Sequence, residues 1–342
     1  MASLTGRRLE RAKASRQFRG GRFQNTSNLG PELTGGSALP IMRDLLFGGR
    51  KRVPRRPLPV ESPIAAWSTR AASGLRVTWF GHSTLLLEID GITILTDPVF
   101  GKRASPFFFT GRTRFHPPPA KISELPTLDA VLLSHDHYDH LNTPSIRQLA
   151  RMRVPFVTSL GVGVRLEKLG VDPELITELD WWETHKVDFL QISAAPAQHF
   201  SGRGVSDRNT TLWSSWALKS NKHNVFFSGD TGLTDELSEI GKRLGPFDLI
   251  MLEIGASHPA WANIHLGPRN ALRAFEMLGG GTLLPIHWST FDLALHKWDE
   301  PAETLLLLGK DMDGKILTPP LGRAIEPELV DGPTPWWRDV DR

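Results

Sequence analysis

The 342-residue sequence contains no cysteine. Disulfide bonds, thiolate nucleophiles and metal sites with sulfur ligands are therefore excluded, so any metal would have to be held by His, Asp or Glu. No stretch approaches the ~18 consecutive apolar residues that a membrane-spanning helix requires. With 40% hydrophobic and 23% charged residues, the composition is that of a globular protein large enough to bury a core without cross-links.

Positive charge is concentrated at the start of the chain. Of the 40 Lys and Arg residues, 13 lie in residues 1–60 against three acids, Glu10, Glu32 and Asp44, a balance of +10. The rest of the chain carries −7, although the whole chain is only +3. The basic segment is consistent either with a solvated tail or with an arm that contacts phosphates or an anionic membrane surface.

Domain boundaries follow from where hydrophobic periodicity begins. Up to about residue 70 the chain is rich in Arg, Gly, Pro and Ser and shows the period of neither a helix nor a strand. We therefore predict a basic, Pro/Gly-rich N-terminal arm over 1–70, a single folded domain over 71–325 and a C-terminal tail over 326–342.

Short β-type runs separated by turns begin at Leu75, and Asp90-Gly91 is a hairpin signal. The pattern predicts strands over 76–80, 84–90, 92–97, 129–135, 154–159, 186–196, 211–218, 224–230, 248–255 and 282–288. It predicts helices over 143–151, 161–169, 234–244 and 266–278. Hairpins mixed with strand–helix alternation indicate an α/β domain in which helices cover sheets.

The strongest local pattern is SHDHYDH at 134–140, which directly follows an apolar run typical of a buried central strand. Because side chains alternate along an extended chain, His135 and His137 can point to one side and bind one metal ion. A turn would bring Asp139 and His140 toward a second ion. So many ionisable groups beside a core would otherwise be poorly satisfied.

Three further polar residues stand at the ends of predicted strands, namely His199, Asp230 and His287. Together with the first cluster they complete two metal sites: His135, His137 and His199 in one, Asp139, His140 and His287 in the other, and Asp230 bridging them. Nitrogen and oxygen ligands of this kind suit Zn²⁺, with Fe or Mn as alternatives. We therefore predict two Zn²⁺ ions as cofactors.

These residues carry a resemblance. The pattern His-x-His-x-Asp-His, a single His, Gly-Asp and a final His resembles the metallo-β-lactamase fold superfamily. Several segments are similar to the N-acyl-phosphatidylethanolamine-hydrolysing phospholipase D group and its bacterial relatives: GRFQN at 21–25, TWFGHSTLLLEIDGITILTDPVF at 78–100, ELDWWE at 178–183, the stretch 197–218, GASHPAWANIHLGP at 255–268 and PIHWSTF at 285–291.

The resemblance implies a fold and a second tier of site residues. The fold is a four-layer αββα sandwich, in which two mixed sheets face each other between helical layers and the metals lie at one edge. Asp97 matches the first motif of the superfamily, whose Asp supports the metal-binding loop from behind. Such support is chemically reasonable, because an imidazole ligand needs a partner on its other nitrogen to fix the tautomer.

Two adjacent divalent ions imply hydrolysis, because they can ionise a bridging water and stabilise the oxygens that gain charge. The predicted function is a dinuclear zinc phosphodiesterase of the phospholipase D type. We expect Asp230 to orient the attacking hydroxide and take its proton, with Asp139 beside it. His265, in the loop that matches the phospholipase group, is the candidate for stabilising or protonating the leaving oxygen.

Positively charged and apolar side chains near the site are the candidates for substrate contact. Arg203, and beyond it Arg208, are candidates for contacting phosphate, while Trp288 and Phe291 lie near motifs that converge on the site. His82, in Gly-His-Ser, is expected to line the site or to support it. The run Pro106–Phe109, together with Trp181, Trp182 and Trp261, offers further apolar surface for a lipid.

Other functions remain open. A lactonase similar to the ascorbate-phosphate lactonases shares these ligands, and a metal-dependent nuclease is favoured by the basic arm but opposed by the acidic body. A non-enzymatic alternative is a membrane-associated protein with a structural metal. We expect a cytoplasmic protein that acts on a small-molecule or lipid phosphodiester, with peripheral contact to an anionic membrane as an option and no specific nucleic-acid partner.

Overall fold

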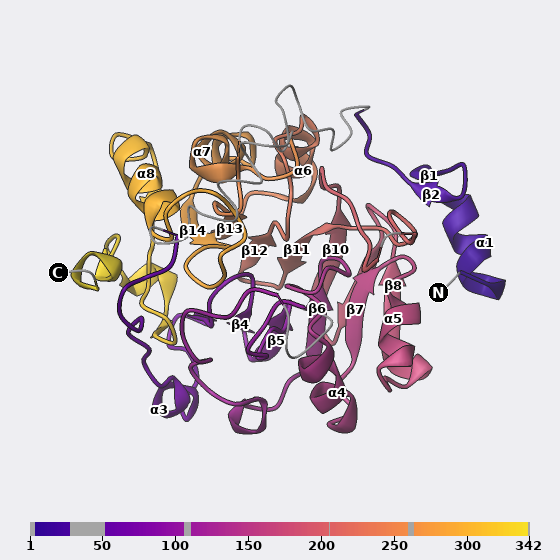
Figure 1. Cartoon of the computed structure of the whole chain (residues 1–342), viewed down its shortest axis with the longest axis horizontal. Coiled ribbons are helices and arrows are strands. Elements are labelled where there is room, and N and C mark those ends of the chain that lie inside the picture. The colour runs from indigo at the N-terminus through magenta and orange to yellow at the C-terminus, as the bar shows by residue number, and fades with distance from the viewer. Residues whose placement is uncertain (1–3, 28–51, 106–110, 205, 259–262, 341–342) are drawn as a thin grey trace.

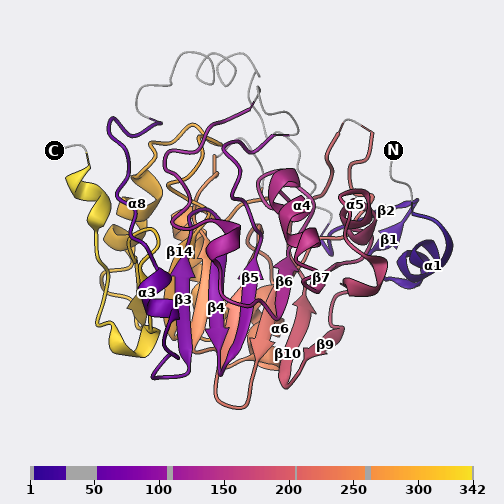
Figure 2. The ribbon, with the colours of Figure 1, turned by 90° about the horizontal axis from the view of Figure 1, so that it is seen from below.

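The computed structural model describes residues 4–27, 52–105, 111–204, 206–258 and 263–340. Two seven-stranded mixed sheets face each other, and helices cover the outer face of each (Figure 1). The same layers are visible from below, where the first sheet lies in front of the second (Figure 2). The predicted fold class, a four-layer αββα sandwich, is confirmed.

The first sheet consists of β16 (Ala324–Ile325), β3 (Leu75–Trp79), β4 (Leu85–Ile89), β5 (Ile92–Thr96), β6 (Ala130–Leu133), β7 (Phe156–Ser159) and β8 (Ile176–Leu179), in that spatial order. Strands β16 to β5 pair antiparallel, as hairpin connections require, whereas β5 to β8 pair parallel. The parallel half contains β6, the strand that leads into the His-rich motif.

The second sheet consists of β15 (Lys315–Ile316), β14 (Thr282–Ile286), β13 (Leu249–Glu253), β12 (Asn224–Phe227), β11 (Ser215–Lys219), β10 (Leu190–Ala195) and β9 (Thr184–Val187). Here β15 to β12 pair parallel and β12 to β9 pair antiparallel. Each sheet therefore has a parallel half whose strands all end at one edge, and the functional side chains follow these strand ends.

Helices cover the two outer faces (Figure 1). On the first sheet lie α4 (Thr143–Arg151) and α5 (Gly163–Lys168), and on the second lie α6 (Glu236–Leu244), α7 (Gly267–Met277) and α8 (Glu300–Leu308). Shorter elements are α3 (Ile64–Trp67) and the 3₁₀ turns η2 (Ile122–Glu124), η3 (Pro173–Leu175), η5 (Pro327–Leu329) and η6 (Trp336–Asp339). Because both faces of the parallel strands are covered, every residue of β6, β12 and β13 is buried.

Several boundaries differ from the sequence prediction. The single strand expected over 186–196 is a hairpin of β9 and β10, because Asp188 turns the chain with a φ of +53°. Strand β11 begins only at Ser215. Helix α8 is missing from the prediction because its apolar residues do not lie on one face, and Leu307 is 71% exposed.

The N-terminal segment is more ordered than its composition suggests. Residues Gly6–Ala14 form α1, followed by the small hairpin of β1 (Phe18–Arg19) and β2 (Arg22–Phe23). Arg8 donates to Glu178 at 2.7 Å, and the side chain of Phe23 is fully buried. Contacts with the body therefore stabilise these elements, which were not predicted from the sequence.

The end of the chain also packs on the body. Trp336 and Trp337 belong to the main core cluster, and the ring centroid of Trp337 lies 5.0 Å from that of Trp288. Helix α1, near the start of the described chain, and α8, toward its end, lie on opposite sides of the sandwich (Figure 1). Among the helices of the described residues, none is both long and apolar enough to cross a membrane.

Candidate metal centre

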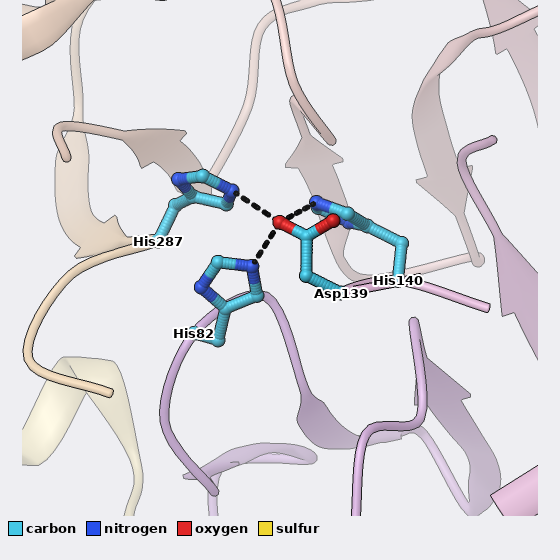
Figure 3. A group of neighbouring side chains, drawn as sticks. All are labelled: His82, Asp139, His140 and His287. Carbon is cyan, nitrogen blue, oxygen red and sulfur yellow. Dashed lines mark hydrogen bonds and ion pairs between the residues drawn. The ribbon is translucent and has the colours of Figure 1, made fainter. Parts of the chain in front are cut away.

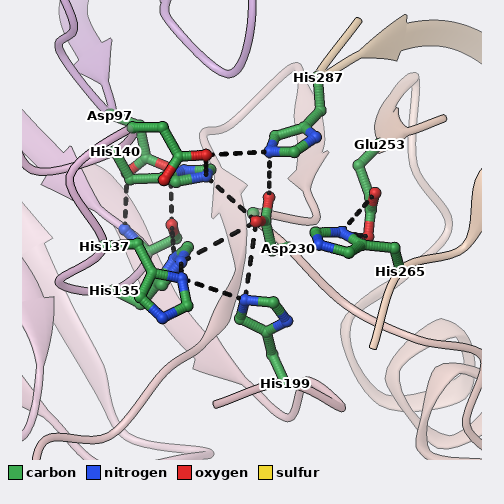
Figure 4. Close-up of polar contacts among 12 residues, drawn as sticks. Asp97, His135, His137, His140, His199, Asp230, Glu253, His265 and His287 are labelled. Atoms are coloured by element: carbon green, nitrogen blue, oxygen red, sulfur yellow. Dashed lines mark hydrogen bonds and ion pairs between the residues drawn. The ribbon is translucent and has the colours of Figure 1, made fainter. Parts of the chain in front are cut away.

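All seven predicted ligands come together at the edge where the parallel strands of both sheets end (Figures 3 and 4). Two groups of four possible ligands are formed, each with its donor atoms within 4.8 Å of one another: His135, His137, His199 and Asp230 in the first, and His82, Asp139, His140 and His287 in the second. The split between the groups is the predicted one, with His82 as an addition.

The first group joins the end of β6 to the loop after β10. His135 Nε2 lies 2.8 Å from His137 Nδ1, and His199 Nε2 lies 3.4 Å from the same atom. The other ring nitrogen of His199, Nδ1, donates to the carbonyl of Ile264 at 2.9 Å. That bond fixes the tautomer and leaves Nε2 as the nitrogen that faces the other donors.

The second group is centred on one carboxylate oxygen (Figure 3). Asp139 Oδ2 lies 3.0 Å from His82 Nε2, 3.6 Å from His140 Nε2 and 3.7 Å from His287 Nε2. His82 follows β3 in a tight turn with a φ of +53°, and its ring centroid lies 3.9 Å from that of His287. The sequence signal for His82 was a polar residue shortly after a buried strand. From that signal we predicted that His82 lines or supports the site, but we did not include it among the ligands.

Asp230 lies between the two groups and contacts both. Its Oδ1 is 3.1 Å from His287 Nε2, and its Oδ2 is 3.1 Å from His140 Nε2. The same Oδ2 lies 3.7 Å from His199 Nε2 and 3.9 Å from His135 Nε2. This central position follows from the sharp turn after β12, where Gly229 has a φ of +55° and directs the next side chain into the cluster.

Burial and neighbouring charges shift the pKa values of these groups in opposite directions. Burial, reinforced by the neighbouring imidazoles, holds the pKa of His135 well below its usual range, and burial likewise lowers the pKa values of His137 and His199. Burial also disfavours protonation of His287, but Asp230 and Asp139 raise its pKa to about 10. The first group therefore presents neutral imidazoles, which is the form that binds metals.

The donor set fits divalent metal ions. Among the described residues, His140 Nε2, His287 Nε2 and Asp230 Oδ1 are buried without a hydrogen-bond partner. Buried polar atoms in this state are costly unless a ligand satisfies them. Five imidazoles and two carboxylates around one point would suit Zn²⁺, Fe or Mn, and the first group alone supplies three His and one Asp.

Asp97 supports this cluster from behind. Its carboxylate accepts the backbone N–H of Ser134 at 2.8 Å, the Ser134 hydroxyl at 2.6 Å and Nδ1–H of His140 at 2.7 Å. It is fully buried at the end of β5. Asp97 therefore holds both the start of the His-rich motif and the ring of His140 through hydrogen bonds, and its support of metal binding stays a prediction.

Replacing Asp97 by Asn should weaken metal binding about 10–100-fold, because one oxygen that accepts from His140 and Ser134 becomes a donor. Metal-competition titration with a chromophoric chelator measures the change. Asp129→Asn is a matched control, since Asp129 accepts Thr93 N–H at 2.7 Å at the opposite end of β6. Equal metal affinity in Asp97→Asn and wild type would contradict the assigned role.

Two nearby residues, Asp136 and Arg203, form hydrogen bonds that hold the loops around the cluster. Asp136, inside the His-rich motif, accepts from Arg165 Nε at 3.1 Å and from Gly202 N–H at 2.7 Å. Arg203 donates to the carbonyls of Asp136 and Leu141 at 2.7 and 2.8 Å. The structure thus gives Arg203 protein partners, and its contact with substrate stays a prediction.

His265 lies beside the cluster and forms a pair with Glu253. Its Nδ1 is 3.0 and 3.1 Å from the two carboxylate oxygens of Glu253, a fully buried residue that ends β13. Burial opposes protonation, but Glu253 raises the pKa of His265 above its usual value. His265 also forms a possible ligand group with Asp230 and His287 (Figure 4). The sequence prediction did not include Glu253, although an acidic residue at the end of an apolar strand could have indicated it.

The predicted apolar contacts divide into two kinds. Phe291 packs edge-on against His82 at a centroid distance of 5.4 Å, so it lies at the cluster. Trp288 stacks on Trp79 at 5.3 Å and donates to the carbonyl of Pro285, so much of its indole belongs to the core, although both residues line one pocket with His82.

The remaining candidates for lipid or phosphate contact differ in position: the ring of Phe200 lies 4.6 Å from that of His137, beside the cluster, whereas the two tryptophans lie beneath other parts of the chain. Arg208 covers the ring of Phe200 at 4.6 Å. Trp181 is buried in a small apolar cluster beneath the arm, and Trp182 lies under Arg243. Pro106–Phe109 and Trp261 fall outside the described residues.

Comparison with known proteins supports the fold and the chemistry. A model of the β-lactamase superfamily domain matches residues 93–288. An uncharacterized protein of Mycobacterium tuberculosis is 47% identical over 289 residues, 83% of this chain and 77% of that protein. N-acyl-phosphatidylethanolamine-hydrolyzing phospholipase D 1 of Caenorhabditis elegans is 36% identical over 268 residues, 75% of each chain.

A solved structure shares the architecture at lower identity. The isothiocyanate hydrolase from Delia radicum gut bacteria superposes with a TM-score of 0.61 over 73% of this chain and 98% of that protein, at 23% identity. At this identity the likeness concerns the fold alone. The match over 93–288 and the relative at 36% identity establish the family: the chain belongs to the metallo-β-lactamase superfamily and is a metal-dependent hydrolase.

Proposed function

We propose that this protein is a dinuclear zinc phosphodiesterase that hydrolyses lipid phosphodiesters of the N-acyl-phosphatidylethanolamine type. The observation that carries the proposal is the position of Asp230, whose two oxygens each lie 3.1 Å from a histidine of the second group while the first group surrounds the same carboxylate. A carboxylate shared in this way suits two ions. The relative named phospholipase D, 36% identical over 75% of each chain, supports the substrate class.

The two four-residue groups would hold one ion each, and Asp230 would hold both. When bound, two divalent ions supply Lewis acidity toward phosphoryl oxygens and make hydroxide available from water near neutral pH. We place this catalytic machinery in residues 71–325, with Arg203, Trp288 and Phe291 as candidates for substrate contact. Fe and Mn remain alternative occupants.

The residues of the chain supply orientation and proton transfer. Asp230 lies within 3.1 Å of His140 and His287, so its carboxylate is held at the centre of the cluster, where it can orient the attacking water and accept its proton. Asp139, whose Oδ2 lies 3.0 Å from His82 Nε2, is the second carboxylate of the cluster. Both carboxylates would therefore contact the attacking water.

The leaving group needs a proton donor, and the His265–Glu253 pair provides one. Because Glu253 engages Nδ1 at 3.0 Å, Nε2 of His265 is the ring nitrogen left to meet the substrate. The reaction is balanced by one water: a P–O bond to the alcohol breaks, a P–O bond to the water oxygen forms, and the proton removed from water is matched by one delivered to the alcohol. The products are a phosphomonoester and an alcohol.

A substrate panel tests the proposal. Purified enzyme is offered an N-acyl-phosphatidylethanolamine, an aryl phosphodiester, a cyclic nucleotide, single-stranded RNA and a lactone, each at equal concentration with added Zn²⁺. We expect the lipid phosphodiester to be hydrolysed fastest, with release of phosphatidic acid. Turnover confined to the lactone or to RNA would instead support a lactonase or a nuclease, and turnover of none would support a structural metal.

A further inference from the structure

The last described part of the N-terminal segment reaches the metal centre. The carboxamide of Asn25 brackets the backbone of His199: its Oδ1 accepts His199 N–H at 3.0 Å, and its Nδ2 donates to the His199 carbonyl at 2.9 Å. The two residues are 174 positions apart in the sequence. Figure 1 shows the segment, drawn in indigo, beside β8 and α5 at the edge of the sandwich.

His199 needs partners of this kind because it lies outside the sheet. Strand β10 ends at Ala195, so no neighbouring strand pairs with the backbone of His199, which is only 1% exposed. Buried backbone N–H and C=O groups must be hydrogen-bonded. Asn25 satisfies both groups at once, while the carbonyl of Ile264 holds the imidazole through Nδ1 at 2.9 Å. Backbone and ring are thus fixed by different parts of the chain.

Asn25 is itself held rigidly. Trp213, 1% exposed, donates from Nε1 to the same Oδ1 at 3.1 Å. Two residues earlier, the N–H of Phe23 donates to the carbonyl of Asn209 at 2.8 Å, and its ring is fully buried. Two residues later, the Ser27 hydroxyl donates to Gln198, the neighbour of His199, at 3.0 Å. Because Asn25 is fixed by these contacts, it can hold the backbone of His199 in one position, whereas a residue in a solvated tail could not.

We propose that Asn25 is a positioning residue of the metal centre, and that the N-terminal segment is therefore part of the site and more than a surface attachment. The inference rests on the proposed function, since it requires His199 to be a metal ligand. It makes a selective prediction: loss of Asn25 weakens the site that contains His199 and spares the site of His82, Asp139, His140 and His287, because Asn25 contacts none of those four.

The test is a Co²⁺ titration of the metal-free, full-length chain, followed by visible absorption, which reports ligand geometry. Asn25→Ala should bind one equivalent of Co²⁺ as wild type does and the other about 10–100-fold more weakly, with an altered absorption band. Two control variants of the same segment should titrate as wild type: Thr26→Ala, whose side chain is exposed, and Arg11→Ala, which removes an ion pair with Glu183. Near-UV circular dichroism checks that each variant is folded.

The outcomes separate this inference from the function it rests on. If the wild type fails to bind two equivalents, the dinuclear centre itself is wrong, and the role of Asn25 is wrong with it. If the wild type binds two and Asn25→Ala matches it in both affinities and in absorption, the positioning role alone is refuted. Equal weakening of both sites with a lower melting temperature would also refute it, since it would indicate general destabilisation.

Discussion

Asp230→Asn is expected to lower turnover about 10²–10⁴-fold while the fold is retained. The substitution keeps the shape of the side chain but removes the charge that faces His140 and His287 at 3.1 Å and the basic oxygen that would take the proton of the attacking water. Two functions are lost together, because the same carboxylate touches both ligand groups. Initial rates on the best substrate of the panel, measured with saturating Zn²⁺, give the size of the effect.

The matched control is Asp235→Asn, which removes the same charge from an exposed position five residues later. Its rate should lie within a factor of about two of wild type, since surface substitutions of this kind rarely cost more than about 0.5 kcal/mol. Near-wild-type turnover in Asp230→Asn would contradict the central place given to this residue. An Asp230→Asn protein that does not fold would instead indicate a structural metal.

Removing the metals should abolish hydrolysis and leave the protein folded. The core does not depend on the site: both sheets and their helices bury large apolar clusters away from the ligands. Dialysis against a chelator should therefore give an inactive protein with native near-UV circular dichroism, and Zn²⁺ should restore the rate. Because ions bind only the folded state, metal at 100 times its dissociation constant should add about 2.7 kcal/mol of stability and raise the melting temperature.

Adding different metal ions to the metal-free protein provides the control for this experiment. Mg²⁺, which prefers six oxygen ligands, should restore little activity in a site built from histidine, whereas Zn²⁺ or Mn²⁺ should restore it. Full activity after exhaustive chelation would contradict a metal-dependent reaction. Unfolding on chelation would show that the metals hold the structure together, which the apolar core argues against.

Local sequence singled out side chains that the structure brings together, because their spacing follows the strands. His135 and His137 alternate directly after a buried strand, and Asp230 and His287 each follow an apolar run, so the strand pattern indicates that each lies at the end of a strand. Asp97 needed the resemblance, because an Asp-Pro pair after a strand is also an ordinary turn.

Other members of the site depend on contacts that no local pattern reveals. His82 joins the second group only because the turn after β3 places it 3.0 Å from Asp139, 57 residues along the chain. Asn25 meets His199 across 174 residues, and α1 is held by Arg8 and its acidic partners on the body. Long-range packing decides these positions, and a single sequence carries little trace of it.

Some of the basic residues at the start of the chain form ion pairs with the body in the structure. Arg8 contacts Glu167 at 2.8 Å and Glu178 at 2.7 Å, and Arg11 pairs with Glu183, so part of the positive balance is matched by acids of the body. These pairs hold α1 against the body. Contact of the remaining basic residues with an anionic membrane stays a prediction.

The most direct test of the account is hydrolysis of N-acyl-phosphatidylethanolamine in ¹⁸O-labelled water, with both products analysed by mass spectrometry. Attack of water on phosphorus, with departure of the alcohol, predicts one ¹⁸O atom in phosphatidic acid and none in the N-acylethanolamine. Label in the alcohol, or label found only in a released fatty acid, would contradict a phosphodiesterase built around Asp230.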